Sequence, residues 1–330
     1  MIRLTPFLLL GLLLLSALTP AGAAAKSKPR APIFGIADQK TQFFGDELFK
    51  DLDITHARYV VPWDTMDGGF QEDELRAWLK EAKADGIKPL LSFGHSRREG
   101  RQKKRPSPRA LQRQFRRLRV NFPWVTEYAT WNEPNHCSQP LCKKPEIAAR
   151  YHDALVRACP TCTILGGELL DSPNMRSWVK RFRRKVKHDP KVWGLHNYID
   201  VNRFRTTGTR ELMKVTRGQI WLTETGGIVN RTAKAKIPFE ESERHAGKST
   251  RWLFDRLTPL SSRIRRVYIY HWNPSTPDDT WDSALVDLEG EPRTAYRVLK
   301  NRIEKAQKSA KARSAARKKA RERKAKRERS

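Results

Sequence analysis

The sequence predicts an α/β protein: a (β/α)8 TIM barrel followed by a basic, disordered C-terminal tail. Eight short apolar runs follow one another at intervals of mostly 24 to 38 residues, and helical patterns fill the intervals. Two of these runs stop abruptly at a glutamate. Strand and helix that alternate eight times over roughly 270 residues match the number of units and the length of this fold. In such barrels the functional groups lie at the carboxyl ends of the strands.

The elements can be followed in chain order. The expected strands start near Ile33, Ala57, Lys88, Val125, Thr163, Val192, Gln219 and Arg266. Apolar residues at a spacing of about 3.6 predict helices around Leu75 to Ala82, Leu111 to Leu118 and Ile147 to Leu155. A last helix from Thr294 to Ile303 is expected to close the barrel. Beyond it the chain has no large apolar residue, so we expect a tail that cannot build a core.

The sequence divides into three parts. Residues 1–25 contain Arg3, an apolar stretch from Phe7 to Leu15 and a run of small residues, which is typical of a cleaved secretory signal peptide; an uncleaved anchor is the alternative. Residues 26–303 form the expected catalytic barrel, and residues 304–330 form the low-complexity tail. No segment of the mature chain approaches the roughly 20 apolar residues of a transmembrane helix. A secreted or cell-envelope-associated protein is predicted.

The charge is strongly positive, with 66 Lys and Arg against 36 Asp and Glu, a formal net charge of +30. The tail carries 13 of these basic residues and 3 of the acidic ones. This pattern suits a flexible or weakly helical arm that binds an anionic cell-envelope polymer electrostatically. Nucleic acid is the competing partner, but export and the lack of an aromatic-basic motif make it secondary.

Four cysteines in a secreted chain indicate disulfides, with three possible connectivities. Cys137 and Cys142 follow one strand, whereas Cys159 and Cys162 precede the next one. In a barrel these places lie at opposite ends of the strands, so the two local pairs are favoured. A four-cysteine zinc site matches the spacing alone and is the alternative.

Two glutamates carry the chemistry. Glu133 follows the fourth strand within Trp131-Asn132-Glu133-Pro134-Asn135, and Glu224 ends the seventh strand within Trp221-Leu222-Thr223-Glu224-Thr225. Hydrolysis of a glycoside with retention needs one carboxyl as acid and a second as nucleophile, roughly 5 to 5.5 Å apart. Trp131 and Pro134 flank the first carboxyl, whereas threonines flank the second, so Glu133 is the expected acid/base.

These motifs resemble those of clan A glycoside hydrolases, near families 5 and 39, and the resemblance covers Ile33 to about Leu299. It implies a retaining β-glycoside hydrolase that needs no cofactor and no metal and acts on an oligo- or polysaccharide. Glu133 would be the acid/base and Glu224 the nucleophile, and Asn132 would bind the sugar 2-hydroxyl.

Further residues match the clan at other strand ends. The resemblance implies that Tyr198, in His196-Asn197-Tyr198, contacts the nucleophile and that Trp272, in Tyr270-His271-Trp272-Asn273-Pro274, stacks on a sugar. Arg58 resembles an arginine that orients the nucleophile, and His95 resembles a substrate-binding histidine. Each also has a structural interpretation as a core polar residue, a packed ring or an ion-pair partner. Glu168 is the alternative candidate for a catalytic carboxyl.

Two other functions compete with this interpretation. A non-catalytic carbohydrate-binding barrel at the cell surface has the same fold, but the presence of both glutamates argues against it. A metal-dependent barrel hydrolase would use the histidines that end strands. The first strand, Ile33 to Asp38, has no His-x-His pair, and no spacing elsewhere forms a metal triad. The sugar and the linkage cannot be inferred from the sequence.

Overall fold

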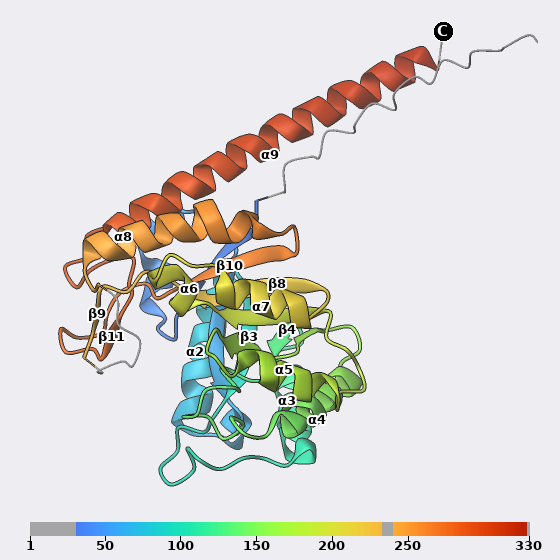
Figure 1. Ribbon diagram of the computed structural model, residues 1–330, viewed down its shortest axis with the longest axis vertical. Coiled ribbons are helices and arrows are strands. Elements are labelled where there is room, and N and C mark those ends of the chain that lie inside the picture. The colour runs from blue at the N-terminus through green and yellow to red at the C-terminus, as the bar shows by residue number, and fades with distance from the viewer. Residues whose placement is uncertain (1–30, 233–239, 329–330) are drawn as a thin grey trace, which may run out of the picture.

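A computed structural model describes residues 31–232 and 240–328. The expected signal peptide therefore lies outside the described residues. Nine parallel strands build the main sheet (Figure 1), in the order β5-β4-β3-β2-β1-β10-β8-β7-β6. Their bounds are β1 Ile33–Ala37, β2 His56–Pro62, β3 Lys88–Gly94, β4 Glu127–Ala129, β5 Thr163–Leu165, β6 Glu168–Leu170, β7 Val192–His196, β8 Gln219–Thr225 and β10 Ile264–Tyr270.

The two ends of this strand order are halves of one barrel strand. β5 pairs with β4, β6 pairs with β7, and only Gly166 and Gly167 separate the two halves. The backbone N–H of Gly166 already donates to Val192 O, and that of Glu168 donates to Trp131 O. The fifth strand thus bonds both neighbours and the sheet closes, which confirms the (β/α)8 barrel. The break itself differs from the single strand that the sequence predicts.

Helices surround the barrel as the periodic patterns predict (Figure 1). They are α1 Glu47–Asp51, α2 Phe70–Ala84, α3 Pro108–Asn121, α4 Pro145–Ala158, α5 Met175–Arg183, α6 Tyr198–Asn202, α7 Thr207–Val215, α8 Glu243–Trp252 and α9 Thr294–Arg327. A small antiparallel pair, β9 Asn230–Arg231 and β11 Trp281–Asp282, lies in the loops after β8 and β10. The start of α3 illustrates how the sequence sets a boundary: Ser107 Oγ accepts the N–H of Ala110, and Pro108 opens the helix.

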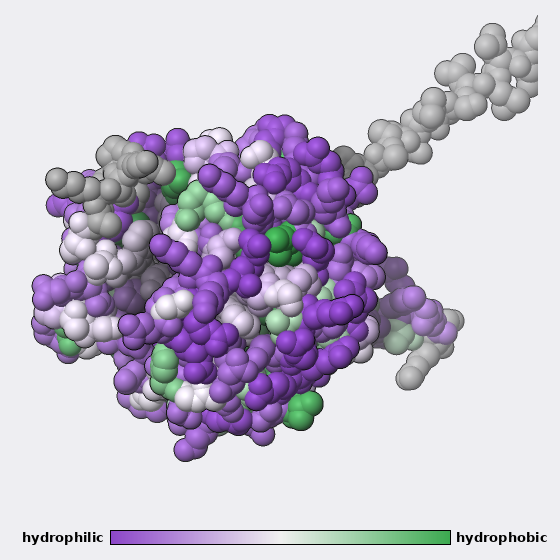
Figure 2. Space-filling model, turned by 90° about the horizontal axis from the view of Figure 1, so that it is seen from below, coloured by the Kyte–Doolittle hydropathy of each residue, from purple (hydrophilic) through white to green (hydrophobic). Residues whose placement is uncertain are grey.

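The core has two parts. A large cluster fills the space between helices and strands, with Trp78, Phe115 and Trp193 among its buried residues. A smaller cluster, which includes Leu90 and Tyr268, is made almost entirely of barrel-strand residues. Hydrophilic residues dominate the face of the molecule that Figure 2 shows. The exposed large apolar residues are scattered: Ile33, Phe70, Val120, Phe204 and Leu288.

The last helix corrects the prediction for the tail. α9 continues without a break past Ile303, its last buried residue, to Arg327. Figure 1 shows its distal part projecting from the body. The sequence contains no glycine or proline after Pro292 and is rich in alanine, lysine and arginine, which are strong helix formers. The lack of large apolar residues therefore predicted the end of the core correctly. It does not end the helix, which continues beyond the core.

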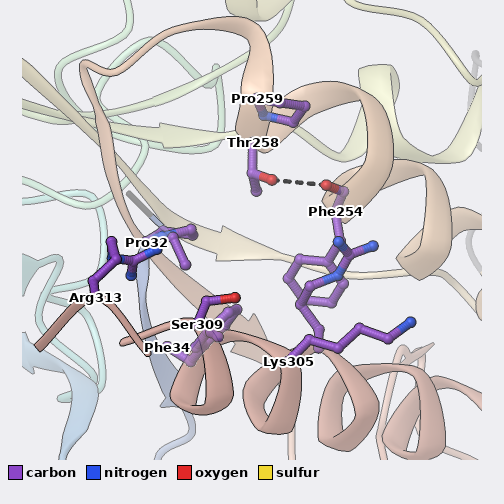
Figure 3. Close-up of a pocket in the computed structure, with 11 residues that line it drawn as sticks. Pro32, Phe34, Phe254, Thr258, Pro259, Lys305, Ser309 and Arg313 are labelled. Atoms are coloured by element: carbon purple, nitrogen blue, oxygen red, sulfur yellow. Dashed lines mark hydrogen bonds between the residues drawn. The ribbon is translucent and has the colours of Figure 1, made fainter. Parts of the chain in front are cut away.

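A pocket of about 250 Å³ lies where α9 leaves the body. Figure 3 shows Pro32 and Phe34 on one side and Ser309 of α9 beside them. Because Phe34 is at the beginning of β1, the pocket lies at the end of the barrel opposite to the carboxyl ends of the strands. No described helix is long and apolar enough to cross a membrane.

Candidate active site

Six polar side chains meet at the carboxyl ends of the strands. They come from five different strands or the residues directly after them: Arg58 in β2, Asn132 and Glu133 after β4, Glu168 in β6, His196 in β7 and Glu224 in β8. Parallel strands in a barrel place their carboxyl ends at one face, so the sequence-predicted residues come together although up to 166 positions separate them.

Arg58 is the centre of this cluster. Its Nε and Nη2 donate to the two carboxylate oxygens of Glu168, at 2.8 and 2.7 Å, in a bidentate pair. Nη1 donates to Glu224 Oε2 at 2.9 Å, and Nη2 also donates to Asn132 Oδ1 at 2.6 Å. The arginine side chain is completely buried. A buried guanidinium with this many acceptors holds each of them in a fixed orientation.

His196 lies between the two predicted catalytic glutamates. Its Nδ1 is 3.1 Å from Glu133 Oε1 and 3.7 Å from Glu224 Oε2. Its Nε2 lies 3.4 Å from Nη2 of Arg58, which can only donate. An ionised Glu133 can only accept, so Nδ1 carries the hydrogen of the contact between the two side chains.

The shared histidine limits the distance between the carboxylates. Because Glu133 Oε1 and Glu224 Oε2 both contact one nitrogen, their separation cannot exceed the sum of those two distances, about 7 Å. Retaining glycosidases place their carboxyls about 5 to 5.5 Å apart, whereas inverting enzymes need roughly 6.5 to 9.5 Å to admit a water. The limit includes the retaining range and excludes most of the inverting one.

The surroundings of the glutamates control their ionisation. Burial raises the pKa of Glu133, but the hydrogen bond and charge of His196, together with the charges of His136 and Arg58, outweigh this effect, so the pKa is below its usual value. For Glu168, burial raises the pKa and Arg58 outweighs this effect, so it too is held low. Glu133 also has a positive φ of 44°, which costs a residue other than glycine free energy and is found where function requires it.

Tyr198 contacts the second glutamate. Its hydroxyl donates to Glu224 Oε1 at 3.1 Å. Burial, together with the negative charge of Glu224, raises the pKa of the tyrosine well above its usual value, so the phenol keeps its hydrogen. The two oxygens of Glu224 thus each accept one hydrogen bond, from Arg58 and from Tyr198.

The other two predicted site residues have their hydrogen-bond partners outside this cluster. His95 follows β3, and its Nδ1 is 3.3 Å from Nε2 of Gln139, whose Oε1 accepts the indole N–H of Trp131. Trp272 corrects the sequence prediction. It is 1% exposed, packs edge-on against Phe49 and donates its indole N–H to Asp46. A ring enclosed in this way cannot stack on a sugar.

Sequence reasoning missed two aromatic residues near Glu224. Trp281 in β11 lies edge-on to Tyr198 and is only partly buried. Tyr270, at the end of β10, is close enough for the charge of Glu224 to raise its pKa further, after the larger effect of burial. The position of Tyr270 at a strand end was a usable signal. Trp281 gave none, because it lies in a loop.

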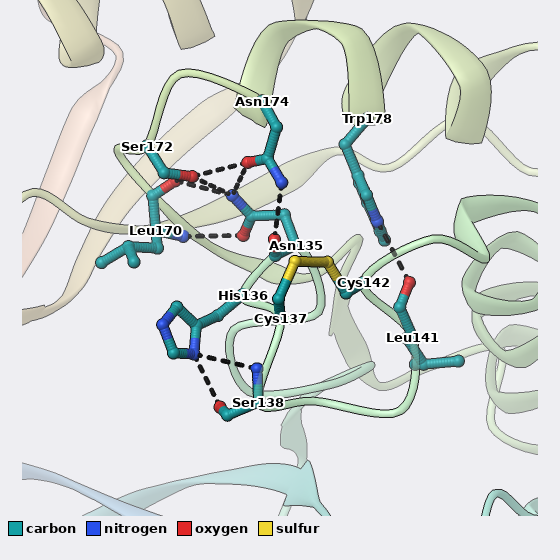
Figure 4. The surroundings of a disulfide bond; sticks show 10 residues. All are labelled: Asn135, His136, Cys137, Ser138, Leu141, Cys142, Leu170, Ser172, Asn174 and Trp178. Atoms are coloured by element: carbon teal, nitrogen blue, oxygen red, sulfur yellow. Dashed lines mark hydrogen bonds between the residues drawn. A yellow bond between two sulfur atoms is a disulfide. The ribbon is translucent and has the colours of Figure 1, made fainter.

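A disulfide supports the loop after Glu133 (Figure 4). Cys137 and Cys142 are joined, and so are Cys159 and Cys162, which confirms the two local pairs. In the same loop, Asn135 Nδ2 donates to Leu170 O at 2.8 Å. The segment that follows the catalytic candidate is therefore fixed to the loop after β6. No group of three or more metal-ligating side chains occurs within residues 31–232 and 240–328.

Comparison with known proteins agrees with this geometry. A family model described as the glycosyl hydrolase catalytic core matches residues 111–298, more than half of the chain. No curated protein sequence matches.

Solved structures with the same fold are similar at low sequence identity. A family 39 glycoside hydrolase from Bacteroides cellulosilyticus WH2 has a TM-score of 0.55 and 14% identity over 84% of this chain, which spans 64% of that enzyme. Xylanase 10B from Thermotoga maritima has a TM-score of 0.59 and 13% identity over 83% of this chain and 95% of its own. A β-glucuronidase from an uncultured Clostridium has a TM-score of 0.57 and 12% identity over 83% of this chain and 50% of its own.

The match over residues 111–298 includes both predicted glutamates, and the solved glycoside hydrolase structures share the barrel fold. The chain therefore belongs to the glycosyl hydrolase catalytic core family.

Proposed function

We propose that the protein is a retaining β-glycosidase that acts on an oligo- or polysaccharide, with Glu133 as acid/base and Glu224 as nucleophile. One observation carries the proposal: both carboxylates contact the same nitrogen of His196, which limits their separation to about 7 Å, a range that includes the separation typical of retention and excludes most of the inverting range. Glu133 and Glu224 are 21% and 16% exposed, so a substrate can reach them, whereas Glu168 is completely buried.

The reaction follows from this arrangement in two steps. Glu133 gives its proton to the glycosidic oxygen while a Glu224 oxygen bonds to the anomeric carbon, and the bond from that carbon to the leaving oxygen breaks. Glu133, now a carboxylate, takes a proton from water, and the water oxygen displaces Glu224 from the sugar. Two inversions leave the configuration of the sugar unchanged.

Neighbouring groups would prepare both steps. Asn132 accepts from Arg58 at Oδ1, and its Nδ2 has no partner among the described residues, so it is available to donate to a sugar hydroxyl beside the reacting carbon. Tyr198 and Arg58 together fix the Glu224 carboxylate. The low pKa of Glu133 in the free protein means that substrate binding must weaken its contact with His196 before it can act as the acid.

Two measurements test the proposal. Proton NMR of the first-formed product should show the same anomeric configuration as an aryl β-glycoside substrate, and an inverted product would contradict the roles assigned to the glutamates. A 2-deoxy-2-fluoro glycoside should label one peptide, and mass spectrometry should find the sugar on Glu224. A protein that binds oligosaccharides but turns over none of a broad polysaccharide panel would instead be the carbohydrate-binding alternative.

We also propose that the protein is exported. Two disulfides support this, because such bonds persist in oxidising compartments. Sequencing the N-terminus of the protein recovered from outside the cytoplasm tests it. We expect a mature chain that begins near Lys26, and recovery only in the cytoplasm with Met1 retained would contradict export.

The exposed part of α9 is proposed to hold the exported enzyme on an anionic envelope polymer. Residues 308–328 are all exposed, and charged side chains surround the helix. Deleting residues 304–330 should abolish sedimentation with isolated cell envelopes at low salt and leave hydrolysis of small soluble glycosides unchanged, because Ile303 is the last buried residue. Equal sedimentation of the intact and shortened proteins would contradict this role.

A further inference from the structure

The broken fifth strand places one carboxylate inside the barrel. Glu168 is the first residue of β6, next to Gly194 of β7 in the strand register. A Cβ on Gly194 would lie 2.6 Å from Glu168 Cγ and 2.8 Å from Thr223 Oγ1, far closer than side-chain atoms pack. Gly167, with a φ of 153°, lies in a region that favours glycine. Two glycines thus make the turn and the space that Glu168 needs.

All contacts of the Glu168 carboxylate are internal. Arg58 donates to both of its oxygens, and Ser92 Oγ donates to Oε1 at 2.9 Å. The side chain is 0% exposed, in contrast to the two glutamates at the mouth. A carboxylate in this position cannot contact a substrate, which rules out Glu168 as the alternative catalytic carboxyl.

We propose that Glu168 is a positioning residue: its bidentate pair with Arg58 aims one guanidinium N–H at Glu224 and another at Asn132. The inference rests on the proposed roles of Glu133 and Glu224. Arginine has a long and flexible side chain, and its planar fork is fixed best by two parallel hydrogen bonds to a carboxylate. Glu168 accepts both of these bonds from Arg58, whereas Glu224 accepts only one bond from Arg58.

The pair also balances charge during the reaction. When Glu224 bonds to the sugar, its carboxylate becomes an ester and its negative charge is lost. A guanidinium whose only strong partner was Glu224 would oppose this loss, because it would be left buried without a counter-charge. With Glu168 in place, Arg58 keeps a complete ion pair throughout. Glu168 therefore supports attack by Glu224 without contacting the sugar.

Glu168→Gln tests the positioning role, because glutamine has the same size and no charge. We expect kcat to fall about 30-fold with KM within about twofold, because the guanidinium loses the bidentate partner that directs it at Glu224. Glu127→Gln is the matched control. Glu127 pairs bidentately with Arg266 where β4 begins, at the opposite end of the barrel. This variant should lose stability but keep its kcat.

A measurement without substrate separates this proposal from the proposed function. The 15N–1H signal of Arg58 Nε, assigned by its loss in Arg58→Lys, reports the bond to Glu168. It should shift and exchange faster with water in Glu168→Gln and in Gly194→Ala, where the added Cβ displaces Glu168, but not in Glu127→Gln. An unchanged signal in Glu168→Gln would overturn the proposal, whatever the activity. Full activity of Glu133→Gln and Glu224→Gln would instead overturn the proposed function and leave this result standing.

Two further variants keep the test decisive. If Glu168→Gln fails to fold, Ser92→Ala removes only the hydroxyl on Oε1 and should produce the same shift of the Arg58 Nε signal and the same fall in kcat, at smaller amplitude. An unchanged signal and an unchanged kcat in this folded variant would overturn the proposal. Azide can replace a missing carboxylate nucleophile. It should restore activity to Glu224→Ala and not to Glu168→Ala. Restoration in the second variant would show that Glu168 itself attacks the sugar and would refute its positioning role.

Discussion

The indole of Trp281 lies edge-on to the phenol ring of Tyr198, with ring centroids 4.9 Å apart and planes inclined by 78°. Tyr198 in turn donates to Glu224, so Trp281 contacts a direct hydrogen-bond partner of the proposed nucleophile. Trp281 is only partly buried, and its indole N–H donates to Ser283 Oγ. It has the exposure that a sugar-stacking residue needs and that Trp272 lacks.

Substitution of each tryptophan in turn should therefore separate an effect on substrate binding from an effect on stability. Trp281→Ala should raise KM for an oligosaccharide about tenfold, the loss of roughly 1.4 kcal/mol of stacking and packing. Trp272→Phe should leave KM unchanged and lower the free energy of unfolding by about 1 to 3 kcal/mol, because Asp46 loses a buried donor at 2.7 Å. Steady-state kinetics and urea unfolding measure both. A raised KM in Trp272→Phe alone would refute this assignment.

Removing either glutamate should abolish most of the activity. Glu133→Gln and Glu224→Gln keep the size of each side chain and remove its charge, so we expect kcat to fall about 10⁴-fold with little change in the melting temperature. Leaving groups distinguish the two variants. Glu133→Gln should retain more activity on substrates whose leaving group needs no proton, such as dinitrophenyl glycosides, and Glu224→Gln should not. Equal residual rates on such substrates would contradict the division of roles.

His196 provides a prediction of pH dependence. Its contact lowers the pKa of Glu133, and an acid catalyst loses activity as the pH rises through its pKa. Removing the contact raises that pKa, so the basic limb of the pH profile should move to higher pH. His196→Gln retains a group near Nε2 and loses the Nδ1 donor, whereas His196→Asn retains a donor near Nδ1. Only the glutamine variant should show the shift, and the same shift in both would refute the argument.

The two disulfides should differ in their effect on catalysis. Each closes a short loop, so its removal should cost about 2 kcal/mol of stability. Cys137→Ser with Cys142→Ser should also reduce kcat several-fold, since this bond closes the loop that follows Glu133. Cys159→Ser with Cys162→Ser, before β5, should leave kcat unchanged. Thermal unfolding and kinetics of both double variants provide the comparison. Equal losses of kcat would show that the first disulfide has no special role.

Strand-end position made most of the site predictable from sequence. Asn132, Glu133 and Glu224 end or follow strands with clear apolar patterns, and closure of a parallel barrel brings such positions to one face whatever the details of the loops. Arg58 was predicted for a different reason. It is the third residue of β2 rather than a strand-end residue, and only its resemblance to the second-strand arginine of family 5 enzymes indicated it.

Features that depend on packing were not predictable in this way. Whether Trp272 faces the mouth or the core depends on Asp46 and Phe49, more than 220 positions away in the sequence. The two glycines that break the fifth strand look like an ordinary loop until the register beside Gly194 is known. The unbroken continuation of α9 to Arg327 was missed for a different reason: hydrophobic periodicity reports packing, and the helix continues on intrinsic propensity after its packing ends.

The direction of α9 determines how an anchored enzyme would be oriented. The helix starts near the mouth of the barrel and passes the pocket beside Phe34 at the opposite end, where Ser309 and Arg313 line the wall. The remaining residues, 314–327, extend about 20 Å farther at 1.5 Å per residue. A polymer that binds this part of α9 would hold the enzyme at the end of the barrel opposite to the active site. The mouth of the barrel would then face away from the polymer. The saccharide that the enzyme hydrolyses would then differ from the anionic polymer that anchors it.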